Sequence, residues 1–87
     1  MNFKISIHKN AVKFLSTPDR NNRKRIIKKI KNLADNPFPK DSIKIKGEKE
    51  KLYRMRVGDY RILYYVDENS FTIFVLNIDK RSRIYKR

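Results

Sequence analysis

The sequence contains no cysteine and no tryptophan, only one histidine, and nine acidic residues against 23 basic ones. Without cysteine, the chain can form neither a disulfide framework nor a thiolate zinc site. No apolar run approaches the ~20 residues that a helix needs to cross a bilayer, and no signal-peptide core follows the N-terminus. We therefore expect no membrane association and a location in the reducing cytoplasm.

Familiar catalytic groups are also scarce. The single histidine, His8, lies at the junction of the expected first strand and first helix, where a cap or surface role is favoured over catalysis. The paired histidines of the familiar metal-independent ribonuclease arrangement are therefore excluded. The acidic residues are scattered at turns without the paired spacing of two-metal chemistry, and no Walker loop, GxSxG elbow or HExxH motif is present. We expect neither a metal nor a small-molecule cofactor.

The most prominent property that is present is positive charge, with a formal net charge of +14. Such a potential concentrates polyanions around a protein and speeds their capture. Nucleic acid is therefore the first partner to consider, and an acidic protein inhibitor is the second. Hydrophobic residues make up 39% of the chain and fall in patterned segments, which argues against disorder. We expect residues 1–87 to form one domain.

The N-terminal part predicts one strand and two helices. Alternation of apolar and polar residues indicates a half-buried strand over 3–7. A short helix is expected at about 8–16, and a second helix begins near Asp19. Apolar residues recur at helical spacing along this second helix, which leaves its basic residues toward water. The segment 36–39 (NPFP) ends it, because proline cannot continue the hydrogen-bond ladder.

The C-terminal part predicts a sheet. Residues 40–51 are expected to form a loop with a short extended piece, and three strands follow: 52–57, 60–66 and 71–78. Their connections are short enough for antiparallel hairpins. The expected order is strand, helix, helix and three strands. The resulting fold class is α+β, with the two helices on one face of a small, mainly antiparallel four-stranded sheet.

Strand alternation gathers basic residues on one face of this sheet. Arg54 and Arg56 share a side of their strand, and Arg61 lies on the corresponding side of the next. We expect the three to lie together on the face that the helices leave uncovered. The last strand then delivers further bases and an aromatic residue from its end: Lys80, Arg81, Arg83 and Tyr85. The pattern predicts a groove for RNA phosphates and a stacked base.

An enzyme with these residues must use cations. Arginines can position RNA for attack by its own 2′-hydroxyl and can neutralise the pentavalent phosphorane. Arginine is a poor base at neutral pH, and Tyr85 could transfer protons only if its environment shifts its pKa from about 10. Such a nuclease should cleave free RNA poorly and improve when another body orients the substrate, which fits a ribosome-dependent enzyme.

Three segments together resemble the RelE branch of the RelE/ParE toxin superfamily. They are KIKG at 44–47, LYRMRVGDYRILYYV at 52–66 and DKRSRIY at 79–85. The resemblance implies a toxin that cuts messenger RNA in the ribosomal A site, leaves a 2′,3′-cyclic phosphate and is restrained by a cognate antitoxin. We expect that antitoxin to be acidic and partly disordered. The expected partners are therefore the ribosome, messenger RNA and the antitoxin.

The resemblance also implies a role for each matching position. Arg54 or Arg56 takes the base role that lysine usually fills, and the exchange for arginine leaves electrostatic stabilisation as the favoured contribution. Arg61 and Arg81 hold the scissile phosphate, while Tyr85 stacks on or orients a base. The expected RNA-binding residues around this catalytic set are Lys44, Lys46, Lys80 and Arg83.

Two other functions are compatible with the same fold. One is a ParE-like inhibitor of DNA gyrase, which would bind protein and cleave no RNA. The other is a non-catalytic nucleic-acid-binding module, which would show tight, salt-sensitive binding without a product. The clustered arginines favour the nuclease.

Overall fold

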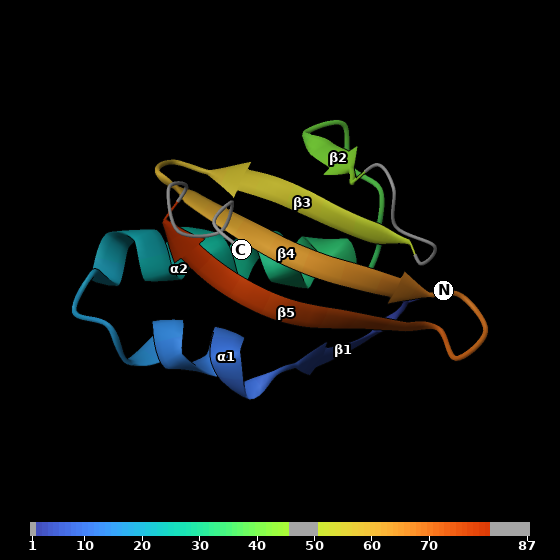
Figure 1. Ribbon diagram of the computed structural model, residues 1–87, viewed down its shortest axis with the longest axis horizontal. Helices are drawn as coiled ribbons and strands as arrows, with labels where there is room; N and C mark the ends of the chain where they lie inside the picture. Colours follow the sequence, from blue (N-terminus) through green and yellow to red (C-terminus); the bar gives the residue numbers. More distant parts are fainter. Residues whose placement is uncertain (1, 46–50, 81–87) are drawn as a thin grey trace.

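The computed structural model describes residues 2–45 and 51–80, which form a mixed sheet with helices packed on one face (Figure 1). Its elements along the chain are β1 (Lys4–Ile7), α1 (Lys9–Val12), a 3₁₀ turn (Lys13–Ser16), α2 (Arg20–Leu33), β2 (Ser42–Lys44), β3 (Leu52–Val57), β4 (Tyr60–Asp67) and β5 (Thr72–Lys80). The α+β class and the two helices are as predicted. No helix in the described ranges is long and apolar enough to cross a membrane.

The sheet has five strands in the order β1-β5-β4-β3-β2, so the prediction of four strands and their order was wrong. The extra strand is β2, which pairs antiparallel with β3 between the partners Ser42–Met55 and Lys44–Tyr53. This short piece was expected only as an extended part of a loop. Three residues are too few to define a strand by alternation, and the free edge of β3 supplies the hydrogen bonds that make β2 a strand.

The strand β1 joins the sheet in parallel beside β5, while β3, β4 and β5 form the expected antiparallel meander. The first of its two hairpins turns at Gly58 and Asp59, as predicted. Gly58 has φ of +59°, a left-handed conformation that glycine adopts without a Cβ clash. The turn therefore brings the end of β3 and the start of β4 close together, which matters for the arginines that flank it.

The predicted helix over 8–16 divides into α1 and the 3₁₀ turn. His8 caps α1, because its Nδ1 accepts a hydrogen bond from the backbone N–H of Asn10 at 3.1 Å. The structure thus confirms the cap role for this histidine. Because Nδ1 satisfies a backbone N–H group at the start of α1, His8 stabilises the N-terminus of this helix.

The helix α2 begins after Asp19, close to the predicted start. The Asp19 carboxylate accepts hydrogen bonds from the Asn22 backbone at 3.4 Å and from the Asn22 side chain at 2.9 Å. The hydrogen bond from the Asn22 side chain keeps the pKa of Asp19 below its usual value. The buried stripe of α2, which consists of Ile26, Ile30 and Leu33, faces the sheet. The helix therefore directs its basic residues away from the core.

The β4 strand supplies the centre of the core. Alternate residues on its helix side are all buried, as the period-2 pattern predicted: Tyr60, Ile62, Tyr64 and Val66. Tyr64 is fully buried, and its hydroxyl donates a hydrogen bond to the backbone oxygen of Pro37 at 2.9 Å. This bond ties the segment after α2 to the sheet and satisfies a polar group that burial would otherwise penalise.

We expect the Tyr64 hydroxyl to make stability fall at alkaline pH. Burial raises its pKa to about 12, above the ordinary tyrosine value of about 10. Because the folded-state pKa is the higher one, the stabilisation is complete below pH 10 and is lost as the pH rises from 10 to 12. Urea unfolding at pH 9 and pH 11.5 should show about 2 kcal/mol more loss in the native protein than in Tyr64→Phe. Equal losses in both proteins would contradict this assignment.

Candidate nucleic-acid interface

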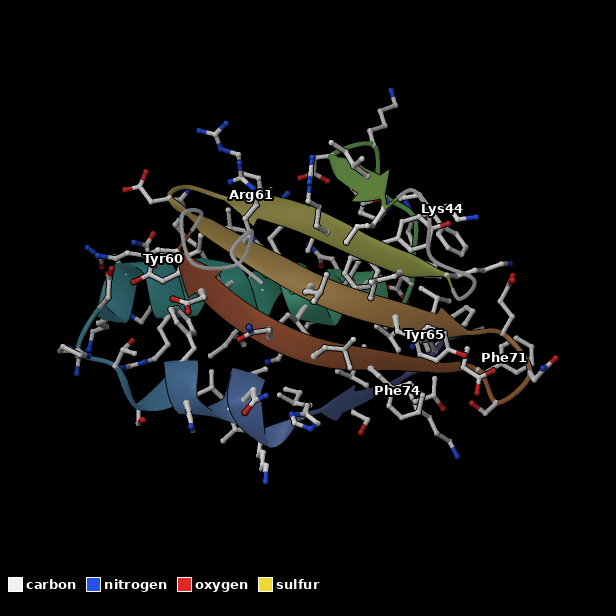
Figure 2. The ribbon with its side chains drawn as sticks, in the orientation of Figure 1. Lys44, Tyr60, Arg61, Tyr65, Phe71 and Phe74 are labelled. Carbon is white, nitrogen blue, oxygen red and sulfur yellow. The ribbon has the colours of Figure 1, made fainter. Side chains whose placement is uncertain are left out.

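Three arginines share the sheet face that points away from the helices. Arg56 lies directly opposite Arg61 in the β3–β4 register, and Arg54 lies opposite Leu63. Opposed residues of an antiparallel pair project to the same side, with Cβ atoms about 5 Å apart. The alternation argument is therefore confirmed in its placement of these residues, and Figure 2 looks onto this face, with Arg61 labelled.

The helices leave this face uncovered, as expected (Figure 1), but Arg61 is buried within it. Its side chain is buried at 7% exposure, whereas Arg54 is half-buried and Arg56 is exposed. Arg61 lies on the central strand β4, between Arg56 of β3 and Asp79 of β5. Burial weakens the screening of the Arg61 charge by water and so strengthens its attraction for an anion.

Asp79 is the residue of this face that the sequence pattern missed. It lies directly opposite Arg61 in the β4–β5 register, which places an acidic residue beside the buried arginine. The predicted strand ended at residue 78, while β5 continues to Lys80. In the sequence, Asp79 directly precedes the basic segment that begins at Lys80. This adjacency was the available sign that an acidic residue lies close to the basic ones. Arg61 thus has a cross-strand neighbour of each charge, Arg56 on one side and Asp79 on the other.

Arg56 lies at the edge of the sheet beside the hairpin turn. Its Nε donates a hydrogen bond to the backbone oxygen of Gly58 at 3.2 Å, which restricts the guanidinium to the neighbourhood of the turn. Among the described residues, β2 pairs with β3 only from Tyr53 to Met55, and the pairing stops before Arg56. The Arg56 side chain is exposed.

An aromatic pair occupies the other end of the same face. Tyr65 of β4 and Phe74 of β5 are register partners, and their rings stack with centroids 5.8 Å apart and an interplanar angle of 22°. Figure 2 shows both near Phe71, toward the opposite end of β4 from Arg61. Four residues of strand separate Arg61 from Tyr65, which corresponds to about 13 Å. Half-buried rings at this position offer a surface on which a base could stack.

The remaining predicted residues do not join this arrangement. Lys44 is the register partner of Tyr53, and Lys80 is the partner of Tyr60, so both lysines lie on the helix side of the sheet. The structure therefore does not bring them together with the three arginines. The other four predicted residues lie outside the described ranges: Lys46, Arg81, Arg83 and Tyr85.

The chemistry available in the described part of the site is electrostatic. Within residues 2–45 and 51–80, no group of three histidine or acidic side chains could hold a metal ion. The arginines can bind and neutralise a phosphate, and the guanidinium fork matches two phosphate oxygens at once. The face can therefore hold a phosphodiester at Arg54, Arg56 and Arg61 and a base at Tyr65 and Phe74.

Comparisons with a family model and with a known protein both match toxins. The family model for the ParE toxin of the type II toxin-antitoxin system parDE matches residues 6–85. The RelE1 protein of Methanocaldococcus jannaschii is 34% identical over 88 residues, which cover 99% of this chain and 98% of that protein.

Solved structures agree in fold. The archaeal RelE of a RelE–RelB complex from Pyrococcus horikoshii is 33% identical with a TM-score of 0.83, and the match covers 95% of this chain and 99% of that one. A RelB–RelE complex from Methanococcus jannaschii matches at 32% identity and a TM-score of 0.75, covering 93% and 95%. The isolated RelE toxin of E. coli is 22% identical with a TM-score of 0.77, over 95% and 90%, and supports the fold alone.

Proposed function

The chain belongs to the ParE toxin family of type II toxin-antitoxin systems and is a toxin of the RelE type, and from this premise we propose that it cleaves messenger RNA in the ribosomal A site. The observation that carries the proposal is the convergence of Arg54, Arg56 and Arg61 on one sheet face. A gyrase inhibitor would not need a buried cation there, whereas the transition state of phosphoryl transfer does.

In the proposed reaction, the 2′-oxygen of one nucleotide attacks the adjacent phosphorus in line, and the bond from phosphorus to the 5′-oxygen of the next nucleotide breaks. The 2′-hydroxyl proton passes to solvent water, and the 5′-oxygen takes a proton from solvent, so the products carry a 2′,3′-cyclic phosphate and a 5′-hydroxyl. Arg61, with Arg81, stabilises the phosphorane charge. Arg54 or Arg56 contributes mainly charge at the attacking side, since a guanidinium holds its proton at neutral pH.

The remaining parts of the proposal concern the other predicted residues, the cofactor requirement and the site of action. Tyr85 stacks on or orients a base, and Lys46 and Arg83 hold the flanking RNA. Lys44 and Lys80 lie on the helix side of the sheet, so they contact this RNA only where it passes around the edge of the sheet. The reaction requires no metal or other cofactor. Because the substrate is a translated message, the site of action is the cytoplasm.

A cognate antitoxin is the third proposed partner, beside the ribosome and the message. Two of the related structures are RelE proteins in complex with RelB. The net charge of +14 favours an acidic antitoxin. Co-expression with the product of the neighbouring gene should yield a complex that survives purification in moderate salt. Separation of the two proteins under those conditions would argue against this partner.

Primer extension on a message translated in vitro tests the proposed function. We expect cuts between the nucleotides of the A-site codon when protein and ribosomes are both present, and no cuts in the same message free of ribosomes. The cleaved ends should carry a cyclic phosphate, which blocks ligation until it is removed. An intact message in both reactions would contradict the proposal.

Inhibition of DNA gyrase is the second candidate, because the matching family model carries the ParE name. This function predicts loss of gyrase supercoiling at stoichiometric protein and no cut in the translated message. A supercoiling assay beside the primer extension separates the two functions. RNA binding without cleavage and without gyrase inhibition would instead identify a non-catalytic binding module.

A further inference from the structure

A second basic site adjoins the arginine face described above and shares Arg56 with it. A groove of about 380 Å³ runs between α2 and the end of β3, and its polar lining comes from both elements. The residues that line it and matter here are Arg25, Lys28, Lys29, Asn32, Arg56 and Gly58. Four of these six are basic and none is acidic. We call this site the α2–β3 groove.

Hydrogen bonds hold two guanidinium groups of this groove at the hairpin turn. Arg25 donates from Nη1 to the Asn22 side chain at 3.3 Å, and Asn22 is itself bonded to Asp19 at 2.9 Å. Gly58 lies directly against Arg25, since a Cβ built on this glycine would be 3.4 Å from Nη1. Arg56 bonds to the oxygen of the same Gly58 through Nε. The two arginines, 31 residues apart in sequence, are therefore positioned at one turn before any ligand binds.

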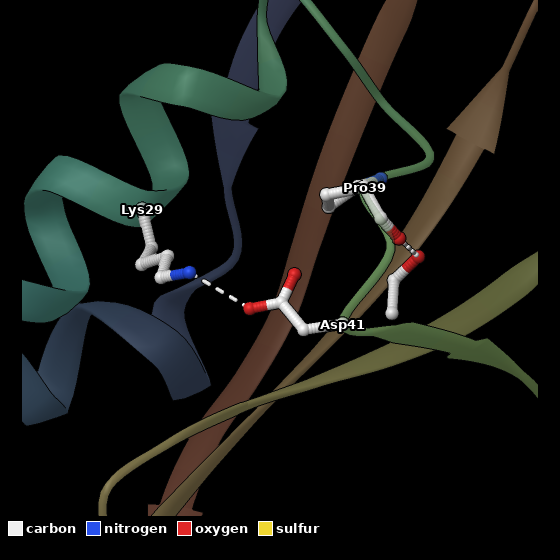
Figure 3. A network of polar contacts seen from close by, with 4 residues as sticks. Lys29, Pro39 and Asp41 are labelled. Atoms are coloured by element: carbon white, nitrogen blue, oxygen red, sulfur yellow. Dashed lines mark hydrogen bonds and ion pairs between the residues drawn. The ribbon is translucent and has the colours of Figure 1, made fainter.

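Within the part of the chain that the structure describes, acidic residues balance the charge of the groove only weakly. Lys29 forms an ion pair with Asp41 at 2.7 Å, and both side chains are more than 40% exposed (Figure 3). Such exposed pairs contribute little to stability. The sequence of α2, RNNRKRIIKKIKNL, contains no acid at all. Like charges held close together cost energy, and a bound anion would relieve that cost.

The lining indicates which kind of anion fits. An acidic amphipathic helix would need apolar pockets for its hydrophobic side chains. Val57, the only apolar side chain that lines the groove within the described residues, is buried in the core. Arginine forks, lysines and an asparagine amide match phosphate oxygens instead. The groove is partly open to solvent, which leaves access for a sugar-phosphate backbone.

We propose that the α2–β3 groove binds the phosphate backbone of an RNA segment distinct from the strand on the arginine face, with Arg56 lying between the two. The segment belongs either to ribosomal RNA or to a flanking part of the message, since both present the same backbone. The inference concerns binding alone and goes beyond the proposed cleavage. It can therefore fail or succeed whether or not the protein cuts RNA.

The test compares two double variants of α2 that remove the same charge. Arg25→Gln with Lys28→Gln changes the groove, and Lys24→Gln with Lys31→Gln changes two exposed bases of the same helix that do not line it. Binding to purified ribosomes, to a 30-nucleotide unstructured RNA and to polyglutamate is measured between 50 and 200 mM salt. Thermal unfolding checks that both variants are folded.

We expect the groove variant to bind RNA about tenfold more weakly. If the unstructured RNA is the ligand, its salt slope should fall by about 1.4, as for two lost phosphate contacts with a single strand. The Lys24/Lys31 variant should change affinity by less than about twofold. Weakening only with ribosomes supports ribosomal RNA as the ligand, and weakening with both supports the message.

Three outcomes would overturn the proposal. Equal weakening in both double variants would show that only total charge matters. Unchanged binding of the groove variant to both the ribosomes and the unstructured RNA would exclude the groove as an RNA site. Loss of polyglutamate binding with RNA binding retained would assign the groove to an acidic protein.

Discussion

Message cleavage on the ribosome is expected to fall at least about 100-fold when Arg61 is replaced by alanine. Arg61 is 7% exposed, so its charge acts on a bound phosphate with little screening by water. Removing one group aimed at a developing negative charge typically costs 10² to 10³ in rate. Single-turnover cleavage of a ribosome-bound message, with toxin in excess, measures the chemical step directly.

Two further variants define what Arg61 contributes. Arg61→Lys retains the charge but not the two-pronged donor, so we expect a loss of about tenfold. Lys40→Ala removes an exposed charge outside the site and should cleave at the native rate. Because Arg61 is buried, unfolding curves accompany the rates, and the lysine variant tests the proposal if the alanine variant does not fold. Native rates in a folded Arg61→Ala protein would refute the role of this arginine.

Truncation of Ile26 to alanine is expected to lower the free energy of unfolding by about 3 kcal/mol. Ile26 is fully buried on α2, where it packs into the core cluster against the sheet. The loss combines transfer of the removed groups to water with the cavity that remains. A domain of this size has a total stability on the order of 5–10 kcal/mol. Urea unfolding at neutral pH should therefore show a much lower midpoint urea concentration for Ile26→Ala than for the native protein.

The neighbouring isoleucine provides a matched control. Ile27 lies on the same helix one residue further on, is only half-buried and has the same side chain. Ile27→Ala should therefore cost about 1 kcal/mol, since it exposes less apolar area and leaves no enclosed cavity. Equal losses of unfolding free energy at the two positions would contradict the packing of α2, in which Ile26 is buried and Ile27 is only half-buried.

The elements with strong periodicity were predictable from sequence. The α2 helix combines a capping acid with apolar residues at helical spacing, and the structure places its start at Arg20 after the Asp19 cap. The β3–β4 hairpin combines alternation with a glycine that the turn requires, and its turn lies at Gly58 and Asp59 as expected. In both cases the signal is local, since a cap, a period and a turn residue each act over a few residues.

The predictions that failed depended on partners distant in sequence. The strand β2 exists because the edge of β3 accepts it, and nothing within Ser42–Lys44 distinguishes it from an extended loop. The pairing of β1 with β5 joins segments more than 60 residues apart. The sheet order places Arg61 on the central strand between Arg56 and Asp79, which residue parity alone does not reveal. Loop closure and edge pairing are set by the whole chain and not by a local pattern.

The sequence by itself determined that the protein is a strongly basic α+β domain and that Arg54, Arg56 and Arg61 share one face, because side-chain direction in a strand follows from residue parity. Only the tertiary structure decided that Asp79 lies beside Arg61, that Lys44 and Lys80 lie on the other side of the sheet, and that Arg25 meets Arg56 at Gly58. Periodicity specifies the face on which a residue lies. Its neighbours across strands and helices depend on register and packing, which arise only when the whole chain has folded.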